Sequence, residues 1–553
     1  MNKSPVVCFY KDDQYIYSLD YELVQSKKDQ TLIHFLEQIQ NQFSQKMKIV
    51  QVDFETKSTV NIFILNSYEI KHKNDFTQNT DLAEILFKTN ITKTDFIHTV
   101  KKIKHDISQG RYYQVNFTSS FSSLKPHRYD TFDLFKHYLH KFNSKFPAYL
   151  PLTDDIQILC YSPELFLSKN DSLLNTQPIK GSSKVSENFD LLINDQKENA
   201  ELSMIVDLLR NDLQSVCDNQ VIVKSHRKKM ALNYMIHTFS EIEGTTHLKC
   251  PEILSNMLPA GSISGCPKTE SLIAIEEYEI SKRGFYTGCI GWWKQDDFQF
   301  NLAIRSFLNN KHNLNYYSGC GIVYDSDPEK EWQEFNNKAG LIDIIKIWDA
   351  FKISETENEL MSIHQQRTFE AIRTVNTKIT FDEVRNIYDQ IPKILESEKK
   401  CRLEINPFDL SDVKIEYQNI IPLPKIINVS VSKYKNQKSG LGLQNFKTNQ
   451  RQYWNQFDPA QEIIGLNTDG FLTETARFNL FIKANDIFYT PDLNSGCING
   501  CLRESFVNNN QIKIGSLTYP LFEKKISLSD LIDAEIYLGN SLRGLIKVNL
   551  IQN

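Results

Sequence analysis

The sequence predicts an α+β protein made of two modules. Near the N-terminus, runs such as 6–10 and 60–65 are rich in aromatic and β-branched residues and are typical of strands. From Thr92 onward, helical patterns such as 95–103 alternate with strand-like runs, which favours helices packed around a large sheet. The stretch 352–359 is polar and lacks an apolar period, so we expect a linker there.

These patterns divide the chain into four expected parts. They are an abbreviated strand-rich part at 1–90, a catalytic domain at 91–350, a linker at 351–366 and a second domain at 367–553. A chain of 553 residues is long enough for three or four domains, although large α/β units can merge two of them.

The composition is that of a globular protein, and neither nucleic acid nor a membrane is expected as a partner. Of the residues, 41% are hydrophobic and 24% are charged, with a formal net charge of -5. The basic run 224–229 is most simply a solvated loop, and no apolar run is long enough to span a bilayer. Ten cysteines lack a paired spacing and no leader precedes Tyr10, so we expect no disulfide framework, no export and a cytoplasmic location.

Lys180 lies in a strand-to-turn pattern, TQPIKGS, at 176–182. A lysine ammonium that is shielded from water is easier to deprotonate, and the free amine is then a nucleophile. An ordinary surface lysine at a turn has the same local pattern, so the surrounding motifs must decide between the two interpretations.

Two acidic pairs have a spacing that suits a hard cation. Glu198 with Glu201, and Glu331 with Glu334, are three residues apart, which places both carboxylates of a pair on one side of a helix. Mg²⁺ prefers oxygen ligands and often completes its shell with a substrate oxyanion. Acid pairs at this spacing also occur on solvated helix faces, which is the alternative.

Seven segments in order resemble the chorismate-utilising enzymes and, at finer grain, component I of the aminodeoxychorismate synthases. They are 110–116 (GRYYQVN), 162–164 (SPE), 176–182, 198–213 (ENAELSMIVDLLRNDL), 259–268 (PAGSISGCPK), 283–288 (RGFYTG) and 319–323 (GCGIV) leading into 327–334 (DPEKEWQE). Anthranilate synthases of this family carry alanine where this chain has Lys180, whereas aminodeoxychorismate synthases carry lysine. The resemblance therefore implies an α/β sandwich around large antiparallel sheets that makes a p-aminobenzoate precursor for folate, with an anthranilate synthase as the less favoured alternative.

The resemblance also assigns the metal and the substrate. Glu201 and Glu334 would bind Mg²⁺ directly, and Glu198 and Glu331 would act through water. The remaining carboxylate of chorismate needs a second anchor, for which the resemblance offers four further residues: Arg305, Tyr286, the backbone amide of Gly321, and Lys338. For Lys338, a solvated lysine on a helix face is the alternative.

The same resemblance implies a covalent mechanism. Glu164 would protonate the departing C4 hydroxyl while Lys180 attacks C2, and ammonia at C4 would then expel the lysine. Gln114 occupies the place where isochorismate-forming relatives use a lysine to activate water, so no base for water attack is present there. His237 matches an active-site histidine, with a satisfied core histidine as the alternative.

The ammonia is expected to come from another protein. No cysteine of the chain lies in the Gly-x-Cys-x-Gly elbow of class I glutaminases. The expected partner is therefore a separate glutamine amidotransferase subunit.

The second module resembles the fold-type IV pyridoxal-phosphate (PLP) enzymes. The segments are 446–453 (FKTNQRQY), 470–481 (GFLTETARFNLF), 490–493 (TPDL), 496–503 (GCINGCLR) and 539–544 (GNSLRG). The resemblance implies PLP on Lys447, with Glu474 at the pyridine nitrogen and Asn540 and Ser541 also at the cofactor. It also allows a homodimer through this domain, by analogy.

One element of that family does not match at the place where we expect it. The family has a His-x-x-Arg element that supplies an arginine for the cofactor phosphate, whereas the corresponding segment here, 382–385, reads DEVR. Arg385 is then the expected phosphate ligand. Aminodeoxychorismate lyase has this fold, so the sequence predicts a bifunctional enzyme of p-aminobenzoate synthesis. An aminotransferase of other substrate scope and a docking module without cofactor are the alternatives for the second half.

Overall fold

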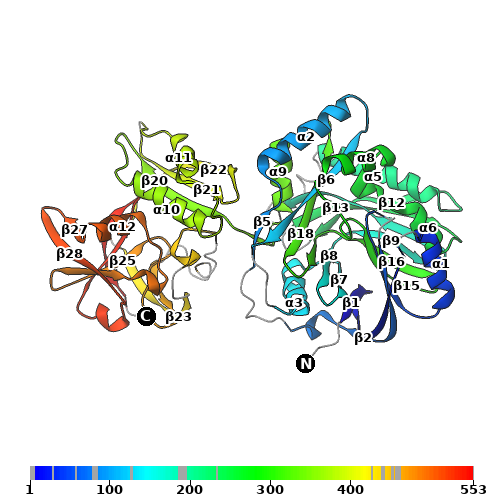
Figure 1. Cartoon of the computed structure of the whole chain (residues 1–553), viewed down its shortest axis with the longest axis horizontal. Helices are drawn as coiled ribbons and strands as arrows, with labels where there is room; N and C mark the ends of the chain where they lie inside the picture. Colours follow the sequence, from blue (N-terminus) through cyan, green and yellow to red (C-terminus); the bar gives the residue numbers. More distant parts are fainter. Residues whose placement is uncertain are drawn as a thin grey trace. The chain divides into compact units, whose positions relative to one another are not determined.

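The computed structural model describes residues 6–27, 30–55, 59–77, 85–124, 129–184, 196–231, 235–395, 397–424, 427–437, 442–449, 454 and 462–551. For 181–184, 196–198, 200–201, 235 and 433–437 it describes the backbone alone. The chain forms two compact units, Met1–Asp343 and Ile344–Asn553 (Figure 1).

The first unit is built on a large antiparallel sheet. Its strands are β1 (Val7–Lys11), β2 (Gln14–Gln25), β3 (Lys48–Val52), β4 (Val60–Lys71), β5 (Leu86–Thr89), β6 (Gln114–Ser123), β7 (Phe146–Thr153), β8 (Ile156–Ser162), β9 (Leu165–Asn170), β10 (Leu173–Gln177), β11 (Ile179–Lys184), β12 (Ile222–Ala231), β13 (Met235–Thr245), β14 (Gly265–Cys266), β15 (Cys289–Lys294), β16 (Asp297–Leu302), β17 (Ser306–Asn309) and β18 (Leu314–Val323). Pairing runs from β6 through β18, β17, β8, β7, β1, β2, β4, β3, β15, β16, β9 and β10 to β13. The strands expected at 6–10 and 60–65 are thus β1 and the first half of β4.

Helices cover this sheet. They are α1 (Leu32–Gln42), α2 (Lys93–Ser108), α3 (Thr131–Phe142), α5 (Gln196–Gln214), α6 (Cys250–Met257), α7 (Gly261–Ser264), α8 (Lys268–Tyr278) and α9 (Pro328–Asn337). The helix expected at 95–103 is α2, which begins after Thr92 because that side chain accepts a hydrogen bond from the Asp95 amide. α2 and α9 contact each other and β18 (Figure 1). The α+β prediction is therefore confirmed.

The second unit contains two sheets. In the smaller, β21 (Lys399–Asn406) pairs with β20 (Ile347–Ile353) and with β22 (Asp409–Asn419), and an apolar face packs on α10 (Met361–Arg373) and α11 (Phe381–Asp389). The larger has the order β24 (Glu462–Asn467), β23 (Asn428–Gln437), β30 (Gly544–Leu550), β29 (Glu535–Asn540), β25 (Asn479–Ala484), β26 (Ile487–Pro491), β28 (Leu517–Lys524) and β27 (Gln511–Ile514). The helix α12 (Cys501–Asn508) contacts β27, β28 and β29.

The expected boundary between the modules differs from the structure. The second unit begins at Ile344, whereas residues 351–366, expected to form a linker, contain the end of β20 and the first part of α10. Phe351 and Ile353 of β20 are buried against α10 and α11. The polar stretch 352–359 is therefore a connection inside the second unit and not a linker between units.

The described helices include no segment that is both long enough and apolar enough to cross a membrane.

Candidate active sites

The first unit contains a cavity of about 280 Å³ where several strands and two helices meet. β11 contributes Lys180, β13 contributes His237, and β18 contributes Gly319 and Gly321. The helices add Ser262 and Ile263 from α7, and Lys330, Gln333, Glu334 and Asn337 from α9. Eight of the residues predicted at this site line the cavity: Lys180, Glu164, His237, Tyr286, Arg305, Gly321, Glu334 and Lys338.

Ser262 connects the expected nucleophile with the expected acid. The Nζ of Lys180 lies 3.5 Å from the Ser262 carbonyl oxygen, and the Ser262 hydroxyl donates to Glu164 Oε1 at 3.2 Å. β11 holds Lys180 in register with Thr238 of β13, whose hydroxyl donates to the Lys180 carbonyl. Ser262 belongs to the predicted motif 259–268, but sequence reasoning gave it no role.

Glu164 has the protonation behaviour that an acid catalyst needs. Its side chain is buried, and burial raises the pKa of the Glu164 carboxyl to about 7, although the nearby Lys180 charge and the Ser262 hydroxyl act in the opposite direction. A carboxyl that titrates near neutral pH can both hold and release a proton under ordinary conditions.

Gln114 lies directly behind Gly321. Its amide is buried, and neither Nε2 nor Oε1 has a hydrogen-bond partner among the described residues. A β-carbon at Gly321 would lie 2.7 Å from the Gln114 Nε2 and 3.7 Å from the Lys180 Nζ. Gln114 therefore places a neutral amide, and not a base, against Gly321.

The predicted carboxylate anchors converge on the same cavity. Arg305 is buried, with a left-handed φ of 52°, and its Nη1 donates to the Lys338 carbonyl at 2.9 Å. Tyr286 is buried and stacks on Tyr317, and burial raises the pKa of the Tyr286 hydroxyl to about 12, so it remains a hydrogen-bond donor. A left-handed φ at a non-glycine residue costs free energy, which the surrounding fold must offset.

Lys338 is part of the site and is not a solvated surface lysine. It caps α9, and its Nζ donates to Glu334 Oε1 and to the Gly319 carbonyl, both at 2.7 Å. Burial alone would lower the pKa of Lys338, yet the adjacent Glu334 carboxylate raises it above its ordinary value.

The expected metal ligands can be placed in part. Both Glu331 and Glu334 belong to α9. Glu331 is buried, Glu334 lines the cavity, and the two share a cluster with the thiol of Cys320. Burial, and then the Glu334 charge, raises the pKa of Cys320 well above its usual value, which leaves the carboxylate oxygens as the donors. This oxygen set fits Mg²⁺. Glu198 and Glu201 lie on α5, and their side chains are outside the described part of the structure.

Arg283 joins three walls of this cavity and was not predicted. Its guanidinium donates to the carbonyls of Asn116 (2.6 Å) and Ile263 (2.8 Å) and to the Thr287 hydroxyl (3.2 Å). It also forms a buried ion pair with Glu279 at 2.7 Å. Asn116, Ile263 and Thr287 all line the cavity. The motif 283–288 contained the signal, because an arginine in an otherwise apolar and glycine-rich segment needs several acceptors when it is buried.

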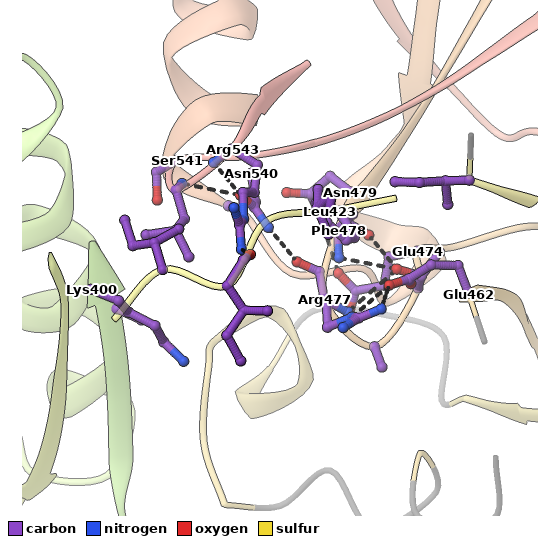
Figure 2. Close-up of a pocket in the computed structure, with 18 of the residues that line it drawn as sticks. Lys400, Leu423, Glu462, Glu474, Arg477, Phe478, Asn479, Asn540, Ser541 and Arg543 are labelled. Atoms are coloured by element: carbon purple, nitrogen blue, oxygen red, sulfur yellow. Dashed lines mark hydrogen bonds and ion pairs between the residues drawn. The ribbon is translucent and has the colours of Figure 1, made fainter. Parts of the chain in front are cut away.

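The second unit contains a larger cavity of about 930 Å³. Four of the residues predicted to contact PLP line it: Lys447, Glu474, Asn540 and Ser541. Figure 2 shows the last three. The structure thus brings together in one cavity residues that the sequence separates by almost a hundred positions.

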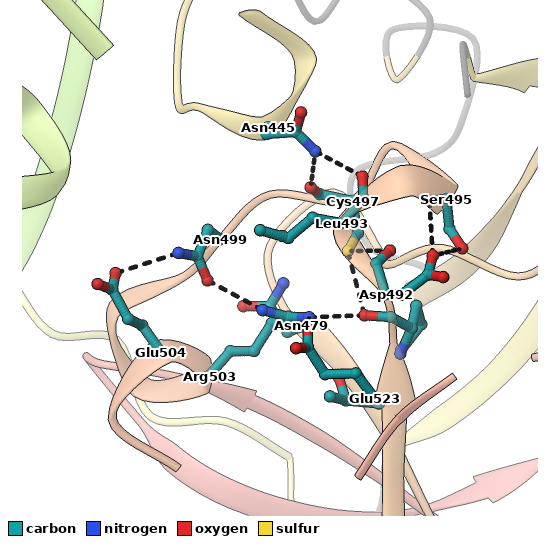
Figure 3. A network of polar contacts seen from close by, with 12 residues as sticks. Asn445, Asn479, Asp492, Leu493, Ser495, Cys497, Asn499, Arg503, Glu504 and Glu523 are labelled. Atoms are coloured by element: carbon teal, nitrogen blue, oxygen red, sulfur yellow. Dashed lines mark hydrogen bonds and ion pairs between the residues drawn. The ribbon is translucent and has the colours of Figure 1, made fainter. Parts of the chain in front are cut away.

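Two other segments of the chain fix the position of the Lys447 backbone. Trp348 of β20 donates its amide to the Lys447 carbonyl at 2.7 Å, and Ile347 forms a bridge with Thr448. Two residues earlier, the Asn445 side chain donates to the carbonyls of Leu493 (2.9 Å) and Cys497 (2.8 Å) (Figure 3). The lysine segment is therefore fixed both to β20 and to the loop before α12.

Glu474 lies on the floor of this cavity. Its side chain is buried, and it accepts hydrogen bonds from the Ile498 amide at 3.1 Å and from Asn479 at 3.4 Å (Figure 2). Gly500 lies beside them, and a β-carbon there would be 2.0 Å from Asn479 Oδ1, so this close approach requires glycine. These contacts fix the Glu474 carboxylate in one orientation, which suits a partner for a protonated ring nitrogen.

The prediction for Arg385 is wrong. It lies on α11, more than half of its side chain is exposed, it is not part of the cavity lining, and its neighbours are Asp382 and Asp389. The residue at the cavity is Arg367, which is buried on α10 and paired with Asp349. Sequence reasoning placed the second domain's start too late and therefore missed the His-x-x-Arg spacing at 364–367.

A buried polar network orients Arg367. Asp349 accepts hydrogen bonds from His364 Nδ1 at 2.9 Å and from the Tyr388 hydroxyl at 2.7 Å. Burial would raise the pKa of Asp349, but His364 and Arg367 hold it below its ordinary value, so the carboxylate stays charged. Burial lowers the pKa of His364. The network thus pairs the Asp349 carboxylate with the Arg367 guanidinium, which also lines the cavity.

The residues present fit PLP. A lysine, a buried carboxylate and a buried arginine line one cavity, which are the groups that the cofactor's aldehyde, ring nitrogen and phosphate require. Asn540 lies at the edge of this group, where its side chain donates to the Arg477 carbonyl at 3.0 Å and accepts from the Leu542 and Arg543 amides.

Comparison with known proteins agrees with this division. Residues 9–342 match the chorismate binding enzyme family, and residues 435–551 match the class IV amino-transferases. The chain is 36% identical over 267 residues to aminodeoxychorismate synthase component 1 of Bacillus subtilis, covering 46% of this chain and 55% of that protein. It is 37% identical over 196 residues to anthranilate synthase component 1 of Saccharolobus solfataricus, covering 34% and 47%. The matching part spans about half the length of these relatives.

Two solved structures share the fold of the first unit. Anthranilate synthase component I of Streptococcus pneumoniae aligns with a TM-score of 0.50 at 23% identity, covering 60% of this chain and 89% of that one. The menaquinone-specific isochorismate synthase of Escherichia coli aligns with a TM-score of 0.50 at 18% identity, covering 61% and 87%. Since the first family match extends over more than half of the sequence, the chain belongs to the chorismate-binding enzymes. A class IV amino-transferase domain follows the chorismate-binding domain.

Proposed function

We propose that the chain makes p-aminobenzoate from chorismate in two steps, one in each unit. The observation that carries the proposal is Lys180, whose amine lies in the same cavity as the buried acid Glu164, with Ser262 between them. Relatives that form anthranilate resemble this chain elsewhere but carry alanine at that lysine. The 36% identity to an aminodeoxychorismate synthase component supports the same choice.

In the first step, ammonia replaces the C4 hydroxyl of chorismate. The Lys180 amine attacks C2, the ring double bonds shift, and the C4–O bond breaks as Glu164 gives its proton to the departing hydroxyl, which leaves as water. Ammonia then attacks C4, the double bonds shift back, and the C2–N bond to Lys180 breaks. The product is 4-amino-4-deoxychorismate. Mg²⁺ at Glu334, with Glu331 behind it, would neutralise a substrate carboxylate when bound.

The chain's other residues orient the substrate. Arg305 and Tyr286 offer hydrogen-bond donors to the pyruvyl carboxylate, and Gly321 allows the backbone to approach it. At the position where isochorismate-forming relatives use a lysine to activate water, the uncharged Gln114 amide offers no base, which favours amination over hydrolysis-like outcomes. Ammonia would be supplied by a separate glutamine amidotransferase subunit.

In the second step, the second unit eliminates pyruvate to give p-aminobenzoate. PLP would supply an electron sink for the substrate amine when bound. Lys447 is the amine that would hold the cofactor and could accept or return a proton. Glu474 would pair with the ring nitrogen, and Arg367 would bind the phosphate.

Product analysis tests both steps at once. The purified chain would be incubated with chorismate, Mg²⁺, PLP and excess ammonium near pH 7, and the products would be separated by chromatography. p-Aminobenzoate together with pyruvate supports both steps. Accumulation of aminodeoxychorismate alone would retain the first step and reassign the second unit as an aminotransferase or a docking module. Anthranilate would contradict the role of Lys180.

A further inference from the structure

The cavity of the second unit contains more positive charge than the cofactor needs. Among the described residues, five basic side chains line it but only two carboxylates do. The basic residues are Arg367, Lys400, Lys447, Arg477 and Arg543, and the carboxylates are Glu462 and Glu474. An excess of cations around one cavity is unfavourable unless an anion binds there, so each cation has to be accounted for.

Three of the five basic residues have an identified role. Lys447 is the expected cofactor lysine, and Arg367 is paired with Asp349. Arg477 is paired with the buried Glu462, and the two are drawn together in Figure 2. Lys400 and Arg543 remain, and no carboxylate among the described residues lies within ion-pair distance of either.

Lys400 faces the cavity from the exposed side of the smaller sheet. In this sheet Lys400 pairs with Gln418 of β22, and Ala350 belongs to β20; all three line the cavity. Successive side chains of a strand point to opposite faces, so the adjacent Cys401 faces the other way and packs against α10 and α11. The Nζ of Lys400 has one contact, a hydrogen bond to Gln418 Oε1 at 3.3 Å, and its other donors can serve a ligand.

Arg543 reaches the same region from the turn between β29 and β30. Its backbone amide donates to Asn540 Oδ1 at 2.8 Å, which fixes the turn, and its guanidinium contacts the Ile421 carbonyl (Figure 2). Burial, and then the positive charges of Arg402 and Arg543, lowers the pKa of Lys400, while the charge of Glu416 acts in the opposite direction. The two cations are therefore close enough to repel each other, and a bound anion would remove this repulsion.

We propose that Lys400 and Arg543 form a carboxylate-binding subsite that holds the ring carboxylate of an aromatic or cyclohexadienyl amine. The inference rests on the proposed function, because it concerns the substrate of the elimination step. In that substrate the amine and the ring carboxylate are at opposite ends of a six-membered ring. The amine must reach Lys447, so a second anchor has to hold the carboxylate elsewhere in the same cavity. Lys400 and Arg543 are the cations available for this role.

The subsite also explains substrate choice. An arginine and a lysine that form no ion pair with a described protein carboxylate would select a ligand that brings its own anionic group, and a neutral analogue would leave both charges unpaired. The loss of one charge-assisted contact weakens binding by about 10-fold or more.

The test compares p-aminobenzoate with p-aminobenzamide, which differs from it by the missing charge. Binding to the full chain loaded with PLP would be measured by isothermal titration calorimetry for the unmodified protein, Lys400→Gln, Arg543→Gln and the control Lys399→Gln. Lys399 is the neighbour of Lys400 on β21 and is absent from the described lining of the cavity. We expect the benzoate to bind about 10-fold more weakly to Lys400→Gln and Arg543→Gln, with the control unchanged and the benzamide unaffected by any substitution.

Equal affinity for the benzoate in all four proteins would overturn the subsite. A second measurement separates this outcome from a failure of the proposed function, namely pyruvate release from aminodeoxychorismate by the same four proteins. Pyruvate release with an unchanged KM in Lys400→Gln and Arg543→Gln would refute the subsite while the function stands. Without any pyruvate release, charge-dependent benzoate binding would still support the subsite and would refute the elimination.

Discussion

The Gln114 side chain lies so close to Gly321 that a side chain at position 321 would overlap with it. A β-carbon at Gly321 would lie 2.7 Å from the Gln114 Nε2, and the Lys180 Nζ would be 3.7 Å away. The buried amide would therefore have to move toward the lysine or out of its position between β6 and β18.

Substitution of Gly321 by alanine is expected to reduce amination of chorismate by at least about 10-fold, because the shifted Gln114 would disturb the nucleophile. Steady-state amination with ammonia as the nitrogen source measures the effect. The elimination step in the second unit serves as an internal control for correct folding. Unchanged amination would show that the pocket around Gln114 can expand.

Substitution of Glu164 by glutamine is expected to abolish amination but to stabilise the protein at high pH. The folded-state pKa of Glu164 is raised from 4.5 to about 7, so its stabilising contribution is present below about pH 4.5 and is lost as the pH rises through 7. Above pH 7 the buried carboxylate therefore costs on the order of 3 kcal/mol, which glutamine would avoid. Thermal unfolding at pH 5 and pH 8 checks this, with a higher Tm of the variant expected at pH 8 alone. Because only the protonated carboxyl can act as the acid, we also expect amination by the unmodified protein to decline above about pH 7.

Substitution of Lys180 by alanine is expected to remove amination while Mg²⁺-dependent binding of chorismate persists. The reason is that the amine is proposed to form a covalent bond with the substrate, whereas Arg305, Tyr286 and the acids of α9 provide affinity. Turnover and chorismate affinity would be measured on the same preparation. Retained formation of aminodeoxychorismate would exclude the covalent route.

Substitution of Arg283 by lysine is expected to lower kcat for amination by about 10-fold and to destabilise the first unit. A lysine keeps the charge opposite Glu279 but cannot donate simultaneously to Asn116, Ile263 and Thr287. Arg111→Lys is a matched control, since Arg111 is also paired with acids but belongs to the surface. If Arg283 acts by positioning the walls, kcat should fall more than the affinity for Mg²⁺ does. Equal effects of both substitutions would point to general destabilisation.

Substitution of Arg367 by glutamine is expected to weaken PLP binding by about 10-fold or more, whereas Arg385→Gln should have no effect. Arg367 lines the cavity, and Arg385 is exposed on α11. Equilibrium dialysis with PLP measures the affinity independently of activity. Circular dichroism on the same variants would show whether the loss of the partner of Asp349 unfolds the smaller sheet. Weaker binding in Arg385→Gln alone would restore the assignment made from the sequence.

The sequence identified residues well where the chemistry depends on a short motif. Lys180, Glu164 and Arg305 come from separate motifs, and the structure places them in one cavity. In contrast, the motifs that contain Ser262 and Arg283 do not indicate a role for either residue, because their contacts are with partners that are distant in sequence. The His-x-x-Arg spacing at 364–367 was visible but lay on the wrong side of a boundary that had been drawn from polarity alone.

The sequence by itself determined the α+β class, the two modules and the residue types for each chemistry, since strand alternation, helix periodicity and motif spacing are local properties of the chain. The tertiary structure decided which of these residues meet. It paired Arg367 with Asp349 and exposed Arg385, and it placed Gly321 against Gln114. It also left Lys400 and Arg543 at the second cavity with no ion pair to a carboxylate among the described residues. Burial and long-range pairing fix these relationships, because the cost of an unpaired charge or an overlapping atom exists only when distant segments pack together.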